Sequence, residues 1–302
     1  MGAGLLRAVG DSKTPLIFLV ISCFVNIVLD IILIRYMNMG VTGAAIATVT
    51  SQIISAILVI TVLYRRNDAL KLRLKSLKIN FSELGKMISI GTAAGMQSAM
   101  YTIANILIQA SINSLGTDTI AAFTAYGKID TLFWMTIQSL GISVTTFTGQ
   151  NFGYGNKERV KKGIIYGMIL SVVVTVIVMV MLKLFGRSIY TLFTNDENVL
   201  KIGTDMLNFM VVAFPAYIII EIFSGCLRGI GDSWIPMIMT AGGVCVLRIV
   251  WIIVMVPKFP NFYTILWAYP LSWIITSTLF LIYMFGFSKM KLWLKSNIYV
   301  ID

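Results

Sequence analysis

The residues best able to bind an ion lie in the first two apolar segments of the chain. Asn26 and Asp30 are four residues apart, so they share one face of a helix. Thr48 lies in the next apolar segment at about the same membrane depth as Asp30, so the three side chains can meet. An amide, a carboxylate and a hydroxyl offer oxygens to Na⁺, and a partly buried carboxylate can exchange a proton. We predict a cation-coupling site for H⁺ or Na⁺; the alternative is that Asp30 only hydrogen-bonds a neighbouring helix.

A second set of polar residues forms a stripe along one predicted helix. Gln97, Tyr101, Asn105 and Gln109 recur at steps of four. Each step turns the side chain by only about 40°, so the stripe winds slowly around the helix. It could line a polar cavity for a substrate, or it could only hydrogen-bond a neighbouring helix.

Charged residues inside apolar segments are few, and they need a partner, water or a function. Asp130 lies near the middle of its segment, where a carboxylate could attract a cationic substrate. The alternative is a structural ion pair with Arg248 or Lys128. Glu221 lies near the end of its segment, where a structural role is the simpler interpretation.

The residue inventory excludes several classes of protein. Histidine is absent, and Cys23, Cys226 and Cys245 show no paired spacing, so a His/Cys metal site or a disulfide framework is unsupported. No nucleophile and base can be combined, so we predict no enzyme activity and no cofactor. The glycine-rich stretch around 149–163 lacks the spacing of a phosphate-binding loop, so an ion gradient must supply any energy.

The elements that must position these residues are membrane helices. Of the 302 residues, 58% are hydrophobic and only 12% are charged. Apolar runs of about 20 residues, long enough to cross a bilayer as helices, recur along the whole chain. We therefore predict an all-α polytopic membrane protein with about eight transmembrane helices. The predicted spans are 14–36, 42–64, 86–114, 119–148, 162–185, 204–227, 234–256 and 262–286.

The distribution of basic residues predicts the orientation. The formal net charge is +11, which could indicate nucleic-acid binding. However, 17 of the 24 Lys and Arg residues fall on the side that holds both chain ends, and 5 fall on the other. By the positive-inside rule, that basic side is cytoplasmic. The charge is therefore explained by membrane topology, and we predict no nucleic-acid partner.

A repeated phrase predicts the internal symmetry. GLLRAVGDSKTP at 4–15 returns as GCLRGIGDSWIP at 225–236, an offset of 221 residues. Each copy ends one helix and begins another, and six spans separate them. An even number of spans gives a parallel repeat with a pseudo-two-fold axis along the membrane normal. Asn26 and Asp30 correspond to Leu247 and Trp251, so the second copy lacks the polar pair.

The repeat also predicts the domains. Residues 1–66 would be the last helix pair of a first lobe, 67–85 a cytoplasmic linker, and 86–302 a complete second lobe of six helices. A full first lobe would need about 135 further residues before Met1. We therefore expect a missing N-terminal segment of four helices.

Several motifs resemble a known family. GLLRAVGDSKTP is followed by NIVLDIILI, by GAAIATVTSQ and, at 144–163, by VTTFTGQNFGYGNKERVKKG. These stretches resemble the multidrug and toxic compound extrusion (MATE) transporters, and within them the drug exporters of Gram-positive bacteria. Asn26, Asp30 and Thr48 also match positions of the proton or sodium network in the first lobe of that family.

The resemblance implies a function. Family members have twelve helices in two lobes around a cleft and export organic cations and other amphipathic drugs in exchange for H⁺ or Na⁺. It implies a multi-pass protein of the bacterial plasma membrane that works as a secondary antiporter, here incomplete. Two alternatives stay open: a truncated remnant that transports nothing, and a flippase for lipid-linked saccharides, which would need a more cationic cavity than Lys128 and Arg248 suggest.

Overall fold

The computed structural model describes residues 2–66, 71–73 and 78–295. In these residues every regular element is helical. Contacts divide the chain into two compact units, Met1–Phe81 and Ser82–Asp302, which are described separately below. Part of the linker predicted at 67–85 lies outside the described residues, and its last residues, from Phe81 onward, already belong to a helix.

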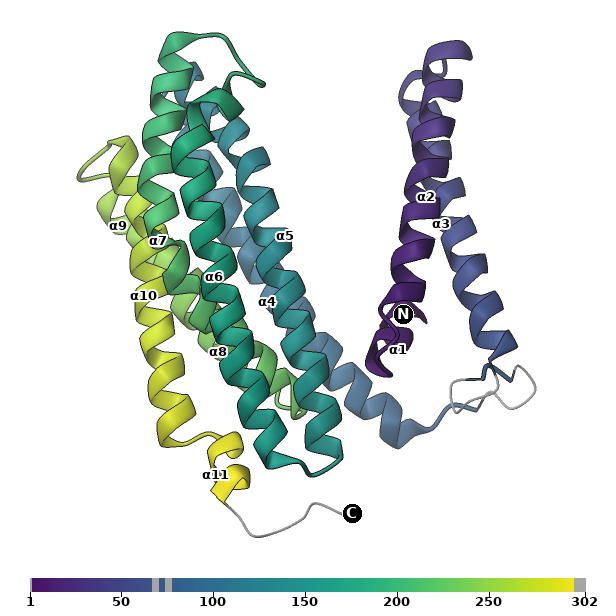
Figure 1. The fold of residues 1–302 in the computed structure, drawn as a ribbon. Helices are drawn as coiled ribbons and strands as arrows, with labels where there is room; N and C mark the ends of the chain where they lie inside the picture. Colours follow the sequence, from purple (N-terminus) through teal and green to yellow (C-terminus); the bar gives the residue numbers. More distant parts are fainter. Residues whose placement is uncertain (1, 67–70, 74–77, 296–302) are drawn as a thin grey trace. The chain divides into compact units, whose positions relative to one another are not determined.

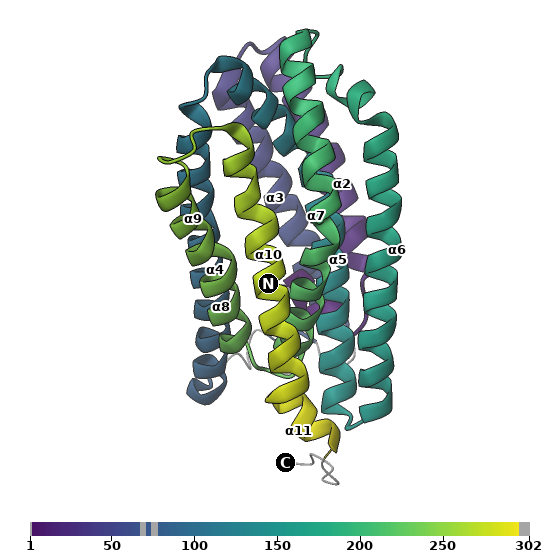
Figure 2. The same cartoon turned by 90° about the vertical axis from the view of Figure 1, so that its left-hand side faces the viewer.

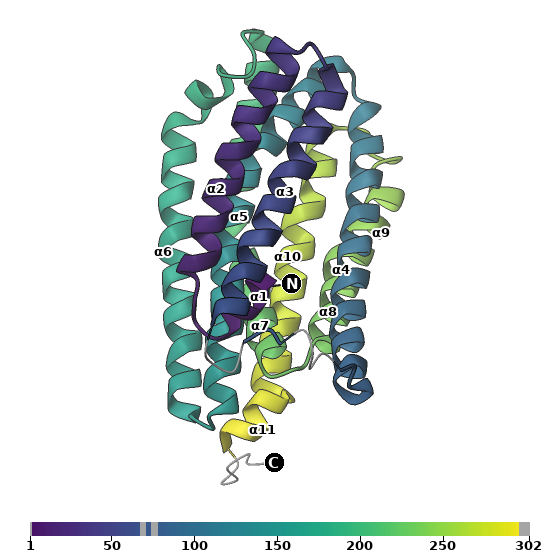
Figure 3. The same cartoon turned by 90° about the vertical axis from the view of Figure 1, so that its right-hand side faces the viewer.

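The first unit is a hairpin of two long helices. The short helix α1 (Gly2–Ala8) leads into α2 (Lys13–Asp30), which continues as the π-helical segment η1 (Ile31–Tyr36) and returns through α3 (Gly40–Arg65). α2 and α3 run side by side, as Figure 3 shows. Most of their surface is apolar and exposed within this unit, which suits helices surrounded by lipid.

The repeated phrase has the same local structure in both copies. In the first, Gly10 has φ +88°, and the backbone N–H groups of Gly10 and Asp11 donate to the carbonyls of Arg7 and Leu6. In the second, Gly231 has φ +85°, and Gly231 and Asp232 donate to Arg228 and Leu227. This is the double hydrogen bond that ends a helix on a left-handed glycine. The predicted equivalence of the two turns is confirmed; the rotation that relates the lobes remains a prediction.

Asp11 connects the first turn to the helix that follows it. Its Oδ1 accepts the backbone N–H of Thr14 at 3.1 Å, and its Oδ2 accepts the Thr14 hydroxyl at 2.9 Å. Arg66, at the end of α3, lies 3.1 Å from Oδ2. These contacts lower the pKa of Asp11 below its ordinary value of 3.8, and the backbone N–H of Thr14 contributes most.

Asp11 should therefore stabilise the fold in a pH-dependent way. Because its pKa is lowered by folding, the stabilisation is present above the ordinary carboxyl range and is lost as the pH falls through the lowered pKa. We expect Asp11→Asn to unfold at a lower temperature than the wild type at neutral pH, and the gap to close below pH 3.8. Asp205→Asn, at an exposed carboxylate, is the control. A gap that does not change with pH would contradict this role.

The second unit contains the remaining helices (Figures 1 and 2). Within it, α7 is central and contacts α5, α6, α8 and α10. Helix α11 is a short C-terminal helix. The elements are α4 (Phe81–Asn113), α5 (Thr117–Gly153), α6 (Lys157–Tyr190), α7 (Glu197–Gly229), α8 (Trp234–Thr240), η3 (Ala241–Val246), α9 (Leu247–Met255), α10 (Phe262–Gly286) and α11 (Lys289–Lys295).

Several of these helices begin at a side-chain cap that the sequence supplies. Asn156 accepts the backbone N–H of Arg159 at the start of α6. Asp196 accepts the N–H groups of two residues at the start of α7, and Asn261 accepts that of Thr264 at the start of α10. A capping oxygen satisfies N–H groups that have no partner within the helix, so it fixes where the helix starts.

Glycines allow α5 and α7 to approach closely. Gly225 and Gly229 are four residues apart on α7, so they face the same way. A Cβ atom on Gly225 would lie 2.9 Å from the carbonyl oxygen of Gly141. One on Gly229 would lie 2.7 Å from the carbonyl oxygen of Thr145 and 3.1 Å from the backbone nitrogen of Gly149. The two backbones are therefore in contact along this stretch, as at small-residue interfaces in membranes.

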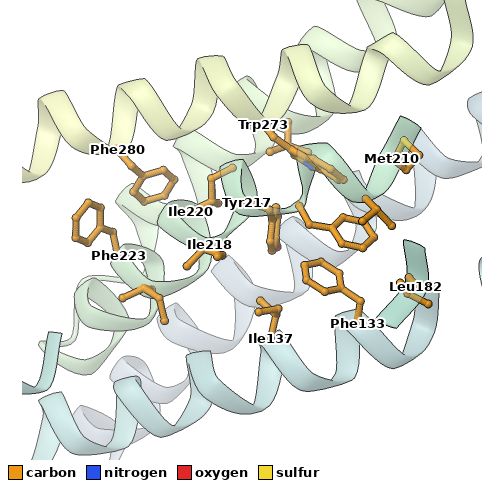
Figure 4. Close-up of a cluster of buried hydrophobic side chains, with 14 of the residues drawn as sticks. Phe133, Ile137, Leu182, Met210, Tyr217, Ile218, Ile220, Phe223, Trp273 and Phe280 are labelled. Atoms are coloured by element: carbon orange, nitrogen blue, oxygen red, sulfur yellow. The ribbon is translucent and has the colours of Figure 1, made fainter. Parts of the chain in front are cut away.

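Aromatic side chains fill the interior of the unit. Phe133 of α5 stacks on Phe214 of α7 with ring centroids 3.9 Å apart. Trp273 of α10 is 1% exposed and meets Tyr217 of α7 edge to face. Figure 4 shows Phe133, Ile137, Tyr217 and Trp273 directed into one cluster. α5 and α10 are thereby fixed against α7.

Each predicted span corresponds to one helical stretch, but the ends differ by up to seven residues, as at the start of α7, which was predicted at 204 and lies at Glu197. Six of the described helical stretches are long and apolar enough to cross a membrane. They are Lys13–Tyr36, Gly40–Arg65, Lys157–Tyr190, Glu197–Gly229, Trp234–Met255 and Phe262–Leu294. α4 and α5 are long enough but are not in this set, because polar residues interrupt their apolar runs. The all-α membrane fold is confirmed, and the count of eight spans remains a prediction.

Candidate functional site

The predicted cation site lies in the first unit, where a polar seam joins α2 and α3. The buried Ser22 hydroxyl donates to the carbonyl oxygen of Ser51 at 2.8 Å, and the Ser51 hydroxyl donates to that of Thr48 at 2.8 Å. Asn26 and Asp30 follow Ser22 at steps of four on α2. They therefore continue the helix face by which Ser22 contacts α3.

Two atoms of this seam are buried without a partner. The amide nitrogen Nδ2 of Asn26 and the carboxylate oxygen Oδ1 of Asp30 make no hydrogen bond. Leaving such groups unpaired is unfavourable, so each is available to another ligand. Thr48 is exposed, and its hydroxyl donates to the carbonyl of Ala44 at 2.9 Å. The structure thus aligns Asn26 and Asp30 but gives no hydrogen bond from either to Thr48.

The polar stripe on α4 lines two cavities in the second unit. Tyr101, Asn105 and Gln109 line the larger one, which has a volume of about 540 Å³. Gln97 and Tyr101 line the smaller one, of about 430 Å³. Every residue of the predicted stripe therefore faces a cavity, and their contact with substrate stays a prediction.

The larger cavity, here called the Asp130 cavity, has its second wall on α5. Tyr126, Asp130, Trp134 and Gln138 recur there at steps of four and all line it. The indole N–H of Trp134 donates to Oδ2 of Asp130 at 2.6 Å. Oδ1 of Asp130 and the Tyr126 hydroxyl are buried with no hydrogen-bond partner. The cavity thus holds a carboxylate that accepts the indole N–H of Trp134 and interacts with the neighbouring Tyr126 hydroxyl.

The remaining wall carries a buried arginine. Arg248 of α9 is 3% exposed and lines the Asp130 cavity with Tyr217 and Tyr269. Its guanidinium carbon lies 4.2 Å from the centre of the Tyr269 ring. Its Nη2 donates to the Ser272 hydroxyl at 3.4 Å, and its Nε is buried without a partner.

The structure gives neither ion pair that was considered for Asp130. Among the described ion pairs, none joins Asp130 to Arg248 or to Lys128. Lys128 is exposed and does not line the cavity, because a two-residue step turns it away from Asp130. The two charges of the cavity, Asp130 and Arg248, are therefore not neutralised by a direct contact.

The smaller cavity, here called the Glu221 cavity, contains an ion pair. Glu221 and Arg228, both on α7, line it, and Nη2 of Arg228 lies 3.5 Å from Oε1 of Glu221. The Tyr217 hydroxyl donates to Oε2 at 3.3 Å. Glu221 is 9% exposed, and its carboxylate lies in the space left by Gly141, where a Cβ atom would collide with it. These contacts agree with a structural role for Glu221.

Two tyrosines separate the cavities. Tyr101 of α4 and Tyr217 of α7 line both, and their hydroxyl oxygens are 3.4 Å apart. Ser98 and Gln138 also border both cavities. The two spaces are therefore neighbours along one polar track between α4, α5 and α7.

Several residues that line the cavities were not predicted from the sequence. Gln138 and Trp134 continue the spacing of Tyr126 and Asp130 on α5, so the step-of-four rule applied to α4 would have found them. Tyr217 stands one turn before Glu221 and is accessible to the same reasoning. Tyr269 and Arg248 come from different helices, and only the packing of α9 against α10 brings them together.

The composition of the Asp130 cavity suits the binding of amphipathic molecules. Aromatic rings offer apolar and cation–π surface, while the amides, the phenols and two separate charges provide directional contacts. The described residues contain no cluster of three or more His, Cys, Asp or Glu that could hold a metal ion.

Comparisons with known proteins agree with this description. The MatE family model matches residues 93–254. The chain is 29% identical over 247 residues to the "Probable multidrug resistance protein YpnP" of Bacillus subtilis, covering 80% of this chain and 54% of that protein. It is 27% identical over 262 residues to the "Probable multidrug resistance protein NorM" of Thermotoga maritima, covering 85% of this chain and 56% of that protein.

Solved structures share the fold. A crystal structure of MATE in the bent conformation superposes with a TM-score of 0.86 at 21% identity, over 98% of this chain and 66% of that one. The chain therefore spans about half the length of the two relatives named above and about two thirds of this structure.

Proposed function

Because this chain belongs to the MatE family, whose members are transporters and not enzymes, we propose that it takes part in exporting organic cations in exchange for H⁺ or Na⁺. The ion and the drug would bind to opposite access states of one alternating cycle, so that each ligand shifts the same equilibrium. The protein is a multi-pass membrane protein. The proposal adds that it lies in the bacterial plasma membrane with both termini in the cytoplasm, and that 1–66, 67–85 and 86–302 are its first-lobe, linker and second-lobe parts.

The observation that carries the proposal is the Asp130 cavity. Its volume of about 540 Å³ is within the range that encloses a drug-sized molecule. Its wall combines aromatic rings with the Asp130 carboxylate, which is the combination that attracts an aromatic cation. Gln97, Tyr101, Asn105, Gln109 and Asp130 would contact the substrate.

We place ion coupling at Asn26, Asp30 and Thr48. The unpaired buried Oδ1 of Asp30 supports this choice, because a bound cation or proton would satisfy it. Na⁺ would find oxygen ligands in the Asp30 carboxylate and in the side-chain carbonyl of Asn26. Thr48 would join only if its hydroxyl released the carbonyl of Ala44.

Replacing Asp30 tests the coupling. In liposomes that contain the chain in the membrane and a cationic dye inside, an inward H⁺ or Na⁺ gradient should accelerate the release of the dye. Asp30→Asn should reduce this gradient-dependent rate by about tenfold or more, because a neutral amide cannot exchange a proton and holds Na⁺ weakly. Equilibrium dye binding should stay unchanged. Asp205→Asn, an exposed charge in the second unit, is the control.

Three outcomes of this assay are informative. A gradient response that survives in Asp30→Asn would move the ion site elsewhere. Dye binding without any dye movement by the wild type would favour the non-transporting alternative. Gradient-dependent transport lost only in Asp30→Asn would support the antiporter.

The flippase alternative is less supported by the cavities. A lipid-linked saccharide carries phosphates, which require an excess of cationic groups. Each cavity is instead lined by one acid and one base: Asp130 and Arg248 in the larger, and Glu221 and Arg228 in the smaller. Lys128, the other cation considered, is outside both.

A further inference from the structure

We propose that Arg248 forms an oxyanion subsite in the Asp130 cavity, so that the preferred substrates are amphiphiles that carry a carboxylate as well as a positive charge. This inference rests on the proposed function, because it specifies the substrate class of the same cavity. It starts from the state of one side chain, Arg248, and not from the cavity's size.

The guanidinium of Arg248 has unused hydrogen-bonding capacity in a buried place. An arginine side chain stays protonated and offers five N–H donors in a planar fork. Here one donor makes a long bond of 3.4 Å to Ser272, and the Nε–H has no partner, although the residue is 3% exposed. A buried charge in this state favours a ligand that supplies both negative charge and acceptor oxygens.

The surroundings hold the fork in place. Tyr269 lies against the guanidinium at 4.2 Å, and Ser272 stands three residues further along α10. A stacked guanidinium loses little further freedom when it binds a planar oxyanion, so the site is ordered before the ligand arrives. A carboxylate can accept two parallel N–H bonds from such a fork.

The acid that could neutralise Arg248 is directed elsewhere. Asp130 lines the same cavity, but its Oδ2 is occupied by the indole of Trp134, and no ion pair joins it to Arg248. Glu221 pairs with Arg228 in the neighbouring cavity. A simple organic cation would satisfy Asp130 and leave Arg248 unpaired. A ligand with separated opposite charges would satisfy both.

A matched pair of dyes tests the subsite by binding alone. The probes are a cationic xanthene dye with a free benzoate and its methyl ester, which differ only in the oxyanion. Binding to the purified 302-residue chain is followed by dye fluorescence anisotropy. We expect the wild type to bind the acid about tenfold more tightly than the ester. Arg248→Gln should remove that preference by weakening acid binding about tenfold, while ester binding changes by less than about twofold.

Two further variants make the result specific. Lys128→Gln removes the same charge from an exposed position on the same unit and should leave both affinities unchanged. Arg248→Lys keeps the charge but loses the fork, so it should retain only part of the preference. If Arg248→Gln is not monodisperse, Arg248→Lys carries the test.

The proposal is overturned if the wild type binds acid and ester equally, if the preference survives in Arg248→Gln, or if Lys128→Gln removes it as well. These results are independent of the liposome assay. Failure of gradient-driven transport would sink the antiporter and leave the dye preference standing, and an absent preference would leave cation export untouched.

Discussion

Gly229→Val is expected to prevent stable packing of α7 on α5. Even alanine at position 229 would place its Cβ atom 2.7 Å from the carbonyl oxygen of Thr145 and 3.1 Å from the backbone nitrogen of Gly149. These are backbone atoms, which cannot rotate away, so the helices must separate. Overpacking of this kind costs about 1–3 kcal/mol for one or two added methyl groups, and more where the backbone has to move. We expect alanine to lower the unfolding temperature and valine to abolish a monodisperse product.

Gly91→Ala is the matched control for this prediction. Gly91 lies inside α4, and a Cβ atom there would meet no other atom within 4 Å. Alanine is the better helix former by about 1 kcal/mol, so this substitution should be neutral or stabilising. Size-exclusion profiles and thermal unfolding in detergent measure both. If Gly229→Val unfolded at the same temperature as the wild type, α5 and α7 would have to lie further apart than they do in the structure.

Asp130→Asn should weaken the binding of a cationic dye about thirtyfold. The substitution keeps the shape of the side chain and an oxygen that accepts the indole N–H of Trp134, but it removes the negative charge from the cavity wall. A hydrogen bond to a charged group contributes about 2 kcal/mol, which corresponds to this factor in the dissociation constant. The binding of an uncharged analogue of the same dye should not change, and equilibrium fluorescence titrations would give both constants.

Asp118→Asn separates local from general effects. Asp118 is an exposed acid in the first turn of the same helix and does not line the cavity. It should leave cation affinity unaltered. Equal losses in Asp118→Asn and Asp130→Asn would reduce the role of Asp130 to a contribution to overall charge, and no loss in either would remove it from the binding site.

Much of the fold could be predicted from the sequence because its signals are local. Apolar runs fix the membrane helices, and Asn156, Asp196 and Asn261 mark where three of them start. The left-handed turns at Gly10 and Gly231 follow from a glycine that ends a helix. The helix ends were predicted less accurately. The predicted span starts at residue 86, whereas α4 begins at Phe81 and includes an ion pair between Glu83 and Lys86 in its first turns.

The site could be predicted only where one helix carries it. The stripe on α4 is periodic, so its residues were found by spacing, whereas the position of Arg248 over Tyr269 depends on how two helices pack. For the same reason the exposure of Lys128 and the separation of Asp130 from Arg248 required the structure. The spacing of residues along one helix predicts the face on which their side chains lie. Which residues of a neighbouring helix they contact depends on every side chain at the interface.

The matching turns at Gly10 and Gly231 have an evolutionary consequence. Their hydrogen bonds agree pairwise across 221 residues of intervening chain, which is the expected trace of a duplicated ancestral gene segment. Each turn requires a residue with positive φ, which glycine adopts without a steric penalty. At the same offset, Asn26 and Asp30 correspond to Leu247 and Trp251, so the helices that follow the two turns differ in polarity.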